Sequence, residues 1–441
     1  MRLSGKFGII GALALMLAAC SAPAAPAPTA APAKPAEKAA EPAAKAAAPA
    51  EKAAPAEKPA APAASSGTDA EWQKIVDAAK NEKITIYGRL LSGPEGTTIA
   101  DAVKKDTGLT VEFVAGAGSP MFSRIKEEVK SGRPTADIYE GAQPWPANIE
   151  RENYFVKLRD LPIPALKEPA STWIVDPFYM SPEGNYLATR FSDSENHIAL
   201  NTKVIPLTDA PRSWQEYAND PKYVGKISWV DPKTTQDIGA IWTRHGYVGK
   251  GLKLEDLWSI YNKQQPQLFP NPVDASGAVG RGEAGMSTSA TGLYSAVNAG
   301  APVKLLLLPE TPIVSLISGM GIIKDTPNMN ASMVFINWVM SKQGMEVIAK
   351  VNQNRTIRRD VPSGVPDVLK AEVINNGKKG PAYAISAEQA ALAGEIEAAG
   401  IMRKLTEGAS LEEFKSAYDA FLKDWESKHG GPQDKPIPVQ E

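Results

Sequence analysis

The sequence predicts an α/β protein made of two doubly wound blocks, and three observations indicate this class. In residues 83–141, apolar strand patterns alternate with amphipathic helical patterns, which is typical of parallel strands joined by crossover helices. A similar alternation recurs in residues 211–308. Two extended segments, 198–202 and 319–323, are expected to carry the chain from one sheet to the other. We therefore expect two lobes, a hinge and a ligand cleft between them.

The first block reads as strand, helix, strand, helix, strand. Gly108 and Gly132 stand where a glycine typically ends a helix. Because ligands of such sheets bind at the carboxyl ends of the strands, the positions of interest are 88–91, 115–120 and 140–145. The predicted elements are strands at 84–87, 109–114 and 136–139, helices at 97–105 and from 116–120 to Gly132, and a preceding helix at 70–80.

The second block and the C-terminal part show the same kinds of pattern. Thr234 or Thr235 is a suitable N-cap for a helix that follows the strand at 225–232. Short apolar runs at 154–156 and 174–179 are interpreted as surface segments. The other predicted elements are helices at 215–218, 254–263, 292–299, 331–340, 388–400 and 411–425, and strands at 187–190, 285–289 and 303–308.

The composition of the 441-residue chain narrows the function classes. Hydrophobic residues make up 43%, enough for a substantial core, and the formal net charge is -2. A nucleic-acid-binding protein shows an excess of basic residues, so we expect no nucleic acid partner. Cys20 is the single cysteine, which excludes an internal disulfide or a cysteine metal site from the folded part.

The N-terminus has the form of an export signal. Residues 1–6 are basic, and the apolar run 7–17 is shorter than the roughly 20 residues that span a bilayer. The sequence LAAC at 17–20 resembles the lipobox of bacterial lipoproteins, which implies acylation of Cys20 and anchoring on the extracytoplasmic side of a membrane. An ordinary secretory signal is the alternative. Residues 20–68, rich in Ala, Pro, Glu and Lys, are interpreted as a disordered tether.

Several stretches together carry a resemblance to a known family. They are 214–217 (WQEY), 220–227 (DPKYVGKI), 282–285 (GEAG), 299–303 (AGAPV) and 335–344 (FINWVMSKQG). In this order and spacing, they are similar to the extracellular solute-binding proteins of ABC importers, in the group related to ferric-ion-binding proteins. The resemblance implies the type II periplasmic-binding-protein fold, capture of a small solute, and delivery to permease subunits in the membrane.

The expected domain division follows from the crossings and the resemblance. We expect a monomer that needs no cofactor and is not an enzyme. The expected parts are a signal peptide at 1–19, the tether at 20–68, lobe 1 at 69–198 and 317–441, and lobe 2 at 199–316.

The candidate cleft residues favour an anionic solute. Arg89 follows the first strand, and Arg190 precedes the first crossing; a guanidinium matches a carboxylate or phosphate. Ser119 and Thr235 open helices, whose N–H groups attract anions. Three polar residues end a strand of the second block, and an aromatic residue follows them: Ser287, Thr288, Ser289 and Tyr294.

Two alternatives stay open. In iron-binding relatives, two adjacent tyrosines hold the metal; Gly292 and Leu293 stand at the matching positions, followed by Tyr294. Their histidine position is replaced by a residue near Arg89, and Glu140 matches their carboxylate. Since ferric iron favours several oxygen ligands, the set is incomplete without a synergistic anion. The other alternative is a lipid-anchored enzyme, because residues 123–126 fit the SxxK pattern of serine acylases.

Overall fold

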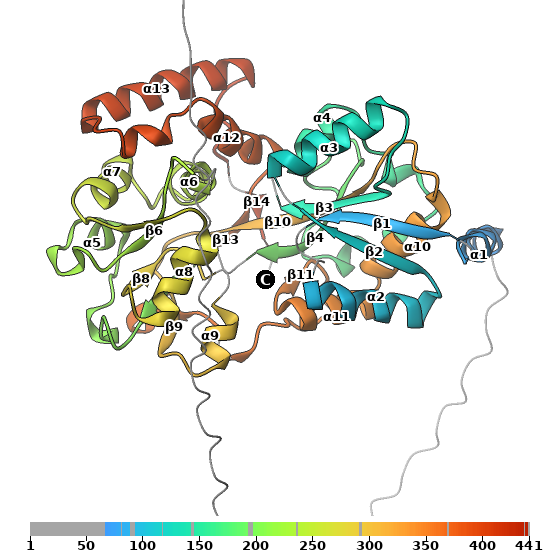
Figure 1. Ribbon diagram of the computed structural model, residues 1–441, viewed down its shortest axis with the longest axis horizontal. Helices are drawn as coiled ribbons and strands as arrows, with labels where there is room; N and C mark the ends of the chain where they lie inside the picture. Colours follow the sequence, from blue (N-terminus) through green and yellow to red (C-terminus); the bar gives the residue numbers. More distant parts are fainter. Residues whose placement is uncertain are drawn as a thin grey trace, which may run out of the picture. The chain divides into compact units, whose positions relative to one another are not determined.

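The computed structural model describes residues 67–80, 82–88, 93–116, 118–142, 145–192, 197–234, 237–290, 293–367, 370–435 and 437–439 (Figure 1). The predicted signal peptide, Cys20 and nearly all of the tether lie outside the described residues. The segment Ala64–Glu441 forms one compact unit.

The first sheet is built around the block predicted at 83–141. β1 pairs in parallel with both β2 and β3, which confirms the predicted alternation. β10 then inserts antiparallel between β3 and β4, so the sheet is mixed. Its order is β11-β4-β10-β3-β1-β2, with β13 and β14 attached to β10. The strands are β1 Lys83–Gly88, β2 Thr110–Ala115, β3 Ile138–Ala142, β4 Leu187–Ser192, β10 Ile313–Ile322, β11 Arg355–Thr356, β13 Ala382–Ala384 and β14 Ile437–Pro438.

Helices cover both faces of this sheet. α10 contacts α1, α2 and α11, whereas α3 packs on α4, and α4 contacts β3 and β10. The ring of Phe113 on β2 meets the ring of Phe335 on α10 edge-on, with centroids 6.5 Å apart. The helices are α1 Gly67–Ala79, α2 Gly93–Thr107, α3 Gly118–Lys130, α4 Trp145–Arg151, α10 Met329–Met340 and α11 Lys342–Asn352.

The segment between α4 and β4 is buried, so its interpretation as surface is wrong. It contains three short 3-10 helices, and its apolar side chains, Phe155 and Phe178 among them, join the first core. A Cβ on Gly321 would lie 2.7 Å from the ring of Phe155, which shows how closely this segment covers β10. The 3-10 helices are η1 Leu158–Asp160, η2 Pro164–Lys167 and η3 Ala170–Thr172.

A second sheet has the order β12-β9-β5-β8, and β6 pairs in parallel with β7 beside it. A bridge between Ile227 and Met286 links the two. The strands are β5 Ile198–Asn201, β6 Ser228–Val230, β7 Gln267–Phe269, β8 Met286–Ser287, β9 Val303–Leu307 and β12 Glu372–Val373. The helices are η5 Leu207–Asp209, α5 Trp214–Asn219, η6 Pro221–Tyr223, α6 Asp237–Trp242, the π-helical segment η7 Thr243–Val248, α7 Leu254–Asn262, α8 Pro272–Arg281, α9 Tyr294–Asn298 and η9 Ile374–Asn376.

The second crossing lies earlier in the chain than predicted. Residues 318–322 are part of the first sheet, where they pair with β3, so placing the crossing at 319–323 is wrong. Gly319 and Gly321 suggested an irregular segment, but they are glycines because Tyr186 and Phe155 pack directly against the strand. Val314 on β10 is buried in the second core and Ile317 in the first, so the chain passes from one core to the other within β10.

The C-terminal helices belong to the second core. Ile396, Phe414 and Trp425 are buried there, although the sequence analysis grouped 317–441 with lobe 1. α12 contacts both α4 and α6, and its consecutive residues 389–393 are buried, so it is enclosed and not amphipathic as predicted. Figure 1 shows α12 and α13 above α6 and α7. These elements are α12 Ala387–Ala398, η10 Met402–Leu405 and α13 Leu411–Lys428.

Candidate functional site

Two of the predicted site residues form a buried ion pair. Arg190 on β4 donates from Nη2 to Oε1 of Glu140 on β3, at 2.6 Å. The two side chains lie on either side of β10, and their exposed fractions are 2% and 0%. Since the residues are 50 positions apart in the sequence, it is the sheet order β4-β10-β3 that brings them together.

The pair lies at the sheet edge where a ligand was expected. Gly88 ends β1 and stands beside Glu140 in the parallel register. A Cβ on Gly88 would be 2.6 Å from the carbonyl oxygen of Glu140 and 2.8 Å from its Oε2. Glycine is therefore needed for the carboxylate to lie across the end of β1. The predicted contact Arg89 follows Gly88 but lies outside the described residues.

The electrostatics of this edge depend on the two charges staying together. Burying an isolated charge is costly, and an ion pair tolerates burial when its geometry is good. Burial raises the pKa of Tyr139, and the negative charge of the adjacent Glu140 raises it further. Tyr139 therefore stays neutral, and the net charge of the Glu140–Arg190 pair is zero.

Two hydroxyls beside the pair were missed by the sequence analysis. Ser318 on β10 and Thr356 on β11 both stand opposite Arg190, and their exposed fractions are 0% and 1%. Neither hydroxyl has a hydrogen-bond partner in the described part of the chain. β11 has only two residues, too few for a strand pattern, and Ser318 stands directly before the segment 319–323 that was predicted to be a crossing.

The polar residues of the second sheet also lie together. Ser287 ends β8, and the exposed fractions of Ser287, Thr288 and Ser289 are 2%, 5% and 7%. The backbone N–H of Ser289 donates to Oγ of Ser287 at 3.4 Å. Ser119 and Tyr294 lie in the first turns of α3 and α9, but their side chains are not described, and Thr235 lies outside the described residues. Their roles as contacts stay predictions.

A family model described as bacterial extracellular solute-binding protein matches residues 98–378, which is well over half of the chain. The chain belongs to this family. The resemblance stated from the sequence is therefore confirmed, and with it the function class: a solute-binding protein of the kind that serves ABC importers. Proteins of this class act outside the cytoplasm, bind small solutes and deliver them to permeases.

Relatives of this solute-binding protein have low sequence identity. An uncharacterized protein of Haemophilus influenzae is 23% identical over 268 residues, 58% of this chain and 72% of its own. A putative 2-aminoethylphosphonate-binding periplasmic protein of Salmonella typhi is 22% identical over 269 residues, 59% of this chain and 73% of its own.

Solved structures confirm the type II periplasmic-binding-protein fold. Iron-bound HitA from Pseudomonas aeruginosa superposes with a TM-score of 0.55 at 19% identity, covering 73% of this chain and 99% of its own. AfuA from Actinobacillus pleuropneumoniae, with fructose-6-phosphate bound, gives 0.53 at 17% identity, covering 76% and 98%. At these identities the likeness shows the fold of the solute-binding protein and not its solute.

The residues behind the iron alternative are only partly described. Glu140 already accepts a hydrogen bond from Arg190, and Leu293 is an apolar, fully buried residue at one of the tyrosine positions. Among the residues that the structure describes, no three His, Cys, Asp or Glu side chains are grouped to hold a metal ion.

The residues behind the enzyme alternative lie on α3. Lys126 forms an ion pair with Glu152 at 3.1 Å, and this hydrogen bond raises the pKa of Lys126. In the SxxK arrangement, the lysine must lose its proton to activate the serine. The environment of Lys126 therefore favours the form that cannot act as a base.

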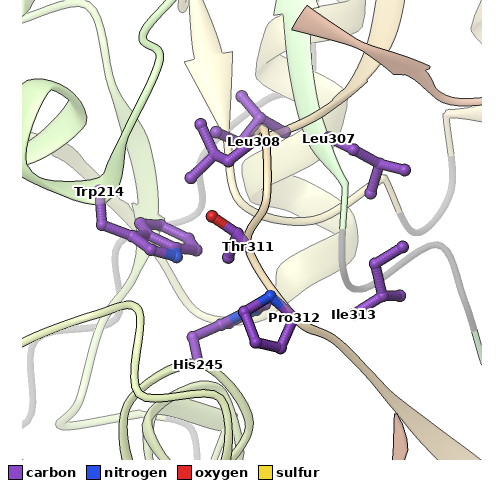
Figure 2. Close-up of a pocket in the computed structure, with 8 residues that line it drawn as sticks. Trp214, His245, Leu307, Leu308, Thr311, Pro312 and Ile313 are labelled. Carbon is purple, nitrogen blue, oxygen red and sulfur yellow. The ribbon is translucent and has the colours of Figure 1, made fainter. Parts of the chain in front are cut away.

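A small pocket of this solute-binding protein lies near the start of β10 (Figure 2). The rings of Trp214 and His245 are 4.9 Å apart at its wall, and Thr311 and Pro312 line it as well. It encloses about 10 Å³, which is roughly the room that one water molecule needs. The pocket is too small for a solute.

Proposed function

We propose that this protein is a lipid-anchored solute-binding protein that captures a small anionic solute and delivers it to an ABC permease. The main support for an anionic solute is the buried pair of Arg190 and Glu140 at the carboxyl ends of β1 and β3. A sheet of this type binds its ligand at that edge, and an arginine there matches the two oxygens of a carboxylate or phosphonate.

The names of two similar proteins support the choice of solute class. One relative is named for 2-aminoethylphosphonate, and one similar structure holds fructose-6-phosphate. Both compounds carry a phosphorus oxyanion. The proposed contacts are Arg89, Ser119, Glu140 and Arg190 from lobe 1, and Thr235, Ser287, Thr288, Ser289 and Tyr294 around lobe 2.

The proposed mechanism is a shift between open and closed forms. A solute that touches only lobe 1 stabilises both forms equally, whereas one that also touches Ser287–Ser289 on lobe 2 favours the closed form. The permease would then recognise the closed form. The predicted domain boundary at 198/199 lies at the start of β5, and the one at 316/317 lies within β10; the proposed hinge is at these two places.

The proposed membrane attachment rests on the N-terminal sequence. Acylation of Cys20 places two or more chains in the bilayer, enough for stable anchoring, and the tether at 20–68 separates the binding unit from the surface. No helix in the described residues is long and apolar enough to cross a membrane. Labelling with a palmitate analogue should mark the wild-type chain and fail to mark a Cys20→Ala variant; equal labelling would remove the anchor from the proposal.

The test of the solute class is a thermal-shift screen of the mature chain. The panel contains 2-aminoethylphosphonate, inorganic phosphate, fructose-6-phosphate, simple carboxylates, neutral sugars and ferric salts. A bound ligand in excess of its dissociation constant raises the unfolding midpoint, and we expect the shift from an oxyanion. A shift only from a neutral sugar, or only from ferric iron, would reject the proposed class.

A further inference from the structure

A row of polar side chains crosses three strands of the first sheet at the proposed site. Arg190 on β4 stands opposite Ser318 on β10 on one side and Thr356 on β11 on the other. Directly opposed residues of antiparallel strands point to the same face, with Cβ atoms about 4.5–5.5 Å apart. The side chains of Ser318 and Thr356 therefore leave the sheet on the same face as Arg190, the face on which Arg190 meets Glu140.

The hydroxyls of Ser318 and Thr356 differ from the hydroxyl of Thr189, which lies on the opposite face of the sheet. Thr189 precedes Arg190 on β4, is equally buried, and donates from Oγ1 to the carbonyl oxygen of Ser318 at 3.2 Å. The hydroxyls of Ser318 and Thr356 have no such partner among the described residues. Buried polar groups in native proteins are nearly always hydrogen-bonded, so two exceptions beside one buried arginine need an explanation.

We propose that Ser318 and Thr356 bind the solute, and that together with Arg190 they hold its oxyanion group. The inference rests on the proposed function and adds two contact residues to it. In the described structure the two hydroxyls lack partners, and a solute oxygen beside each hydroxyl would supply the missing partner. Each hydroxyl can donate or accept, so the pair suits a carboxylate or phosphonate in either protonation state.

The charge of the row also restricts the solute. Glu140 balances Arg190, so the described part of the site offers no full positive charge to a dianion. A charge that is buried without compensation is strongly unfavourable. The row of Arg190, Ser318 and Thr356, with Glu140 beside it, therefore prefers a solute whose own ammonium group offsets part of its negative charge, such as an aminoalkylphosphonate or an amino acid, over a dianion of the same size.

The helix α10 provides a matched control. Ser332 on α10 is fully buried, and its hydroxyl also lacks a partner among the described residues. The N–H of the preceding Ala331 donates to Glu82, which lies just before the amino end of β1. Ser332 is therefore at the end of the sheet opposite to Gly88 and the ion pair, and it should not touch a solute at the proposed site.

The experiment is isothermal titration calorimetry of the mature chain with 2-aminoethylphosphonate and ethylphosphonate. Ser318→Ala and Thr356→Val should each weaken binding of 2-aminoethylphosphonate about 5- to 10-fold, the effect of one lost hydrogen bond. Ser332→Ala should leave the affinity unchanged. Thr356→Ser keeps a hydroxyl, unlike Thr356→Val, and should bind 2-aminoethylphosphonate with wild-type affinity. Without solute, Ser318→Ala should unfold at the wild-type midpoint or above, because no hydrogen bond is lost.

The outcomes separate this inference from the proposed function. Wild-type affinity for 2-aminoethylphosphonate in both Ser318→Ala and Thr356→Val overturns the two contacts, and leaves the solute class standing. Binding of ethylphosphonate as tight as that of 2-aminoethylphosphonate overturns the charge preference. Failure of the wild-type chain to bind any oxyanion, in the calorimeter and in the thermal-shift panel, rejects the proposed function and the inference together.

Discussion

Two buried carboxylates of this protein have opposite environments. Glu140, in the first sheet, is paired with the guanidinium of Arg190. Glu397 on α12 accepts a hydrogen bond from the backbone N–H of Gly239 on α6, and no salt bridge joins it to a cation in the described residues. Burial, together with the negative charge of Asp237, raises the pKa of Glu397 to about 7.

The difference shows how the two regions use a buried acid. At the sheet edge, Arg190 comes from another strand and pairs with Glu140. The carboxylate therefore stays charged and is available to organise a polar solute site. Between α12 and α6, the carboxylate is buried in a helix contact, and α12 lies outside the family match at 98–378. There the protonated form is the better tolerated one, and the packing depends on pH.

The largest effect is expected from breaking the ion pair. Arg190→Met removes the guanidinium that pairs with the buried carboxylate of Glu140, so the free energy of unfolding should fall by about 3–5 kcal/mol in urea titrations. The double variant Glu140→Leu with Arg190→Leu removes both charges and should recover most of that loss. A single variant that costs less than about 1 kcal/mol, or a double variant as unstable as the single, would mean that the pair is not electrostatically coupled.

The next effect concerns the pH dependence of Glu397. In the unfolded chain this residue ionises near 4.5, whereas in the folded chain it ionises at about 7. The folded state thus holds an extra proton between these values, and its stability falls as the pH rises from 4.5 to 7, by up to about 3 kcal/mol.

Glu397→Gln removes this titration and keeps an oxygen that accepts the Gly239 N–H. Relative to wild type, the variant should therefore be more stable at pH 8 than at pH 5. Urea titrations at the two pH values measure the difference. If the free energy of unfolding differs between wild type and variant by the same amount at both pH values, burial does not raise the pKa of Glu397.

A smaller effect is expected at the end of β1. Gly88→Ala places a methyl group against the backbone oxygen and the carboxylate of Glu140, so the strand ends must separate, at a cost of about 1–3 kcal/mol. Gly116→Ala, at the end of the neighbouring β2, meets only the flexible end of Met121 and should cost less. If thermal unfolding shows equal losses of stability for the two variants, the requirement for glycine at position 88 does not come from the ion pair.

The smallest effect is expected on α3. The Lys126–Glu152 pair is partly exposed, with exposed fractions of 31% and 40%, so Lys126→Met should leave the midpoint of urea unfolding close to that of the wild type. Ser123 is exposed, and Ser123→Ala should leave solute affinity unchanged. Loss of a hydrolytic turnover in Ser123→Ala would instead support the enzyme alternative.

The sequence predicts the first sheet well because its signals are local. β1, β2 and β3 are short apolar runs separated by helices that end at glycine, and each appears within a few residues of its expected place. α8 was missed, although Asn271 caps it before Pro272 and Gly282 ends it in the left-handed conformation. That combination of start and stop residues is a usable signal that the sequence analysis did not apply.

The candidate site depends on long-range pairing that periodicity does not encode. Glu140 and Arg190 were chosen separately, one from the resemblance and one from its place before a crossing, and only the insertion of β10 between their strands joins them. Ser318 and Thr356 face Arg190 through strand register, which a single sequence does not specify. For the same reason, the burial of α12 between α4 and α6 was not foreseen.

The central claim is that an oxyanion solute binds at the edge formed by Arg190 and Glu140. The most direct measurement is calorimetric titration of 2-aminoethylphosphonate into the wild-type mature chain and into the Glu140→Leu, Arg190→Leu double variant, after both are shown to unfold cooperatively. The account predicts saturable binding to the wild type and at least a roughly 100-fold weaker affinity in the double variant. Equal affinity in the two proteins would contradict it.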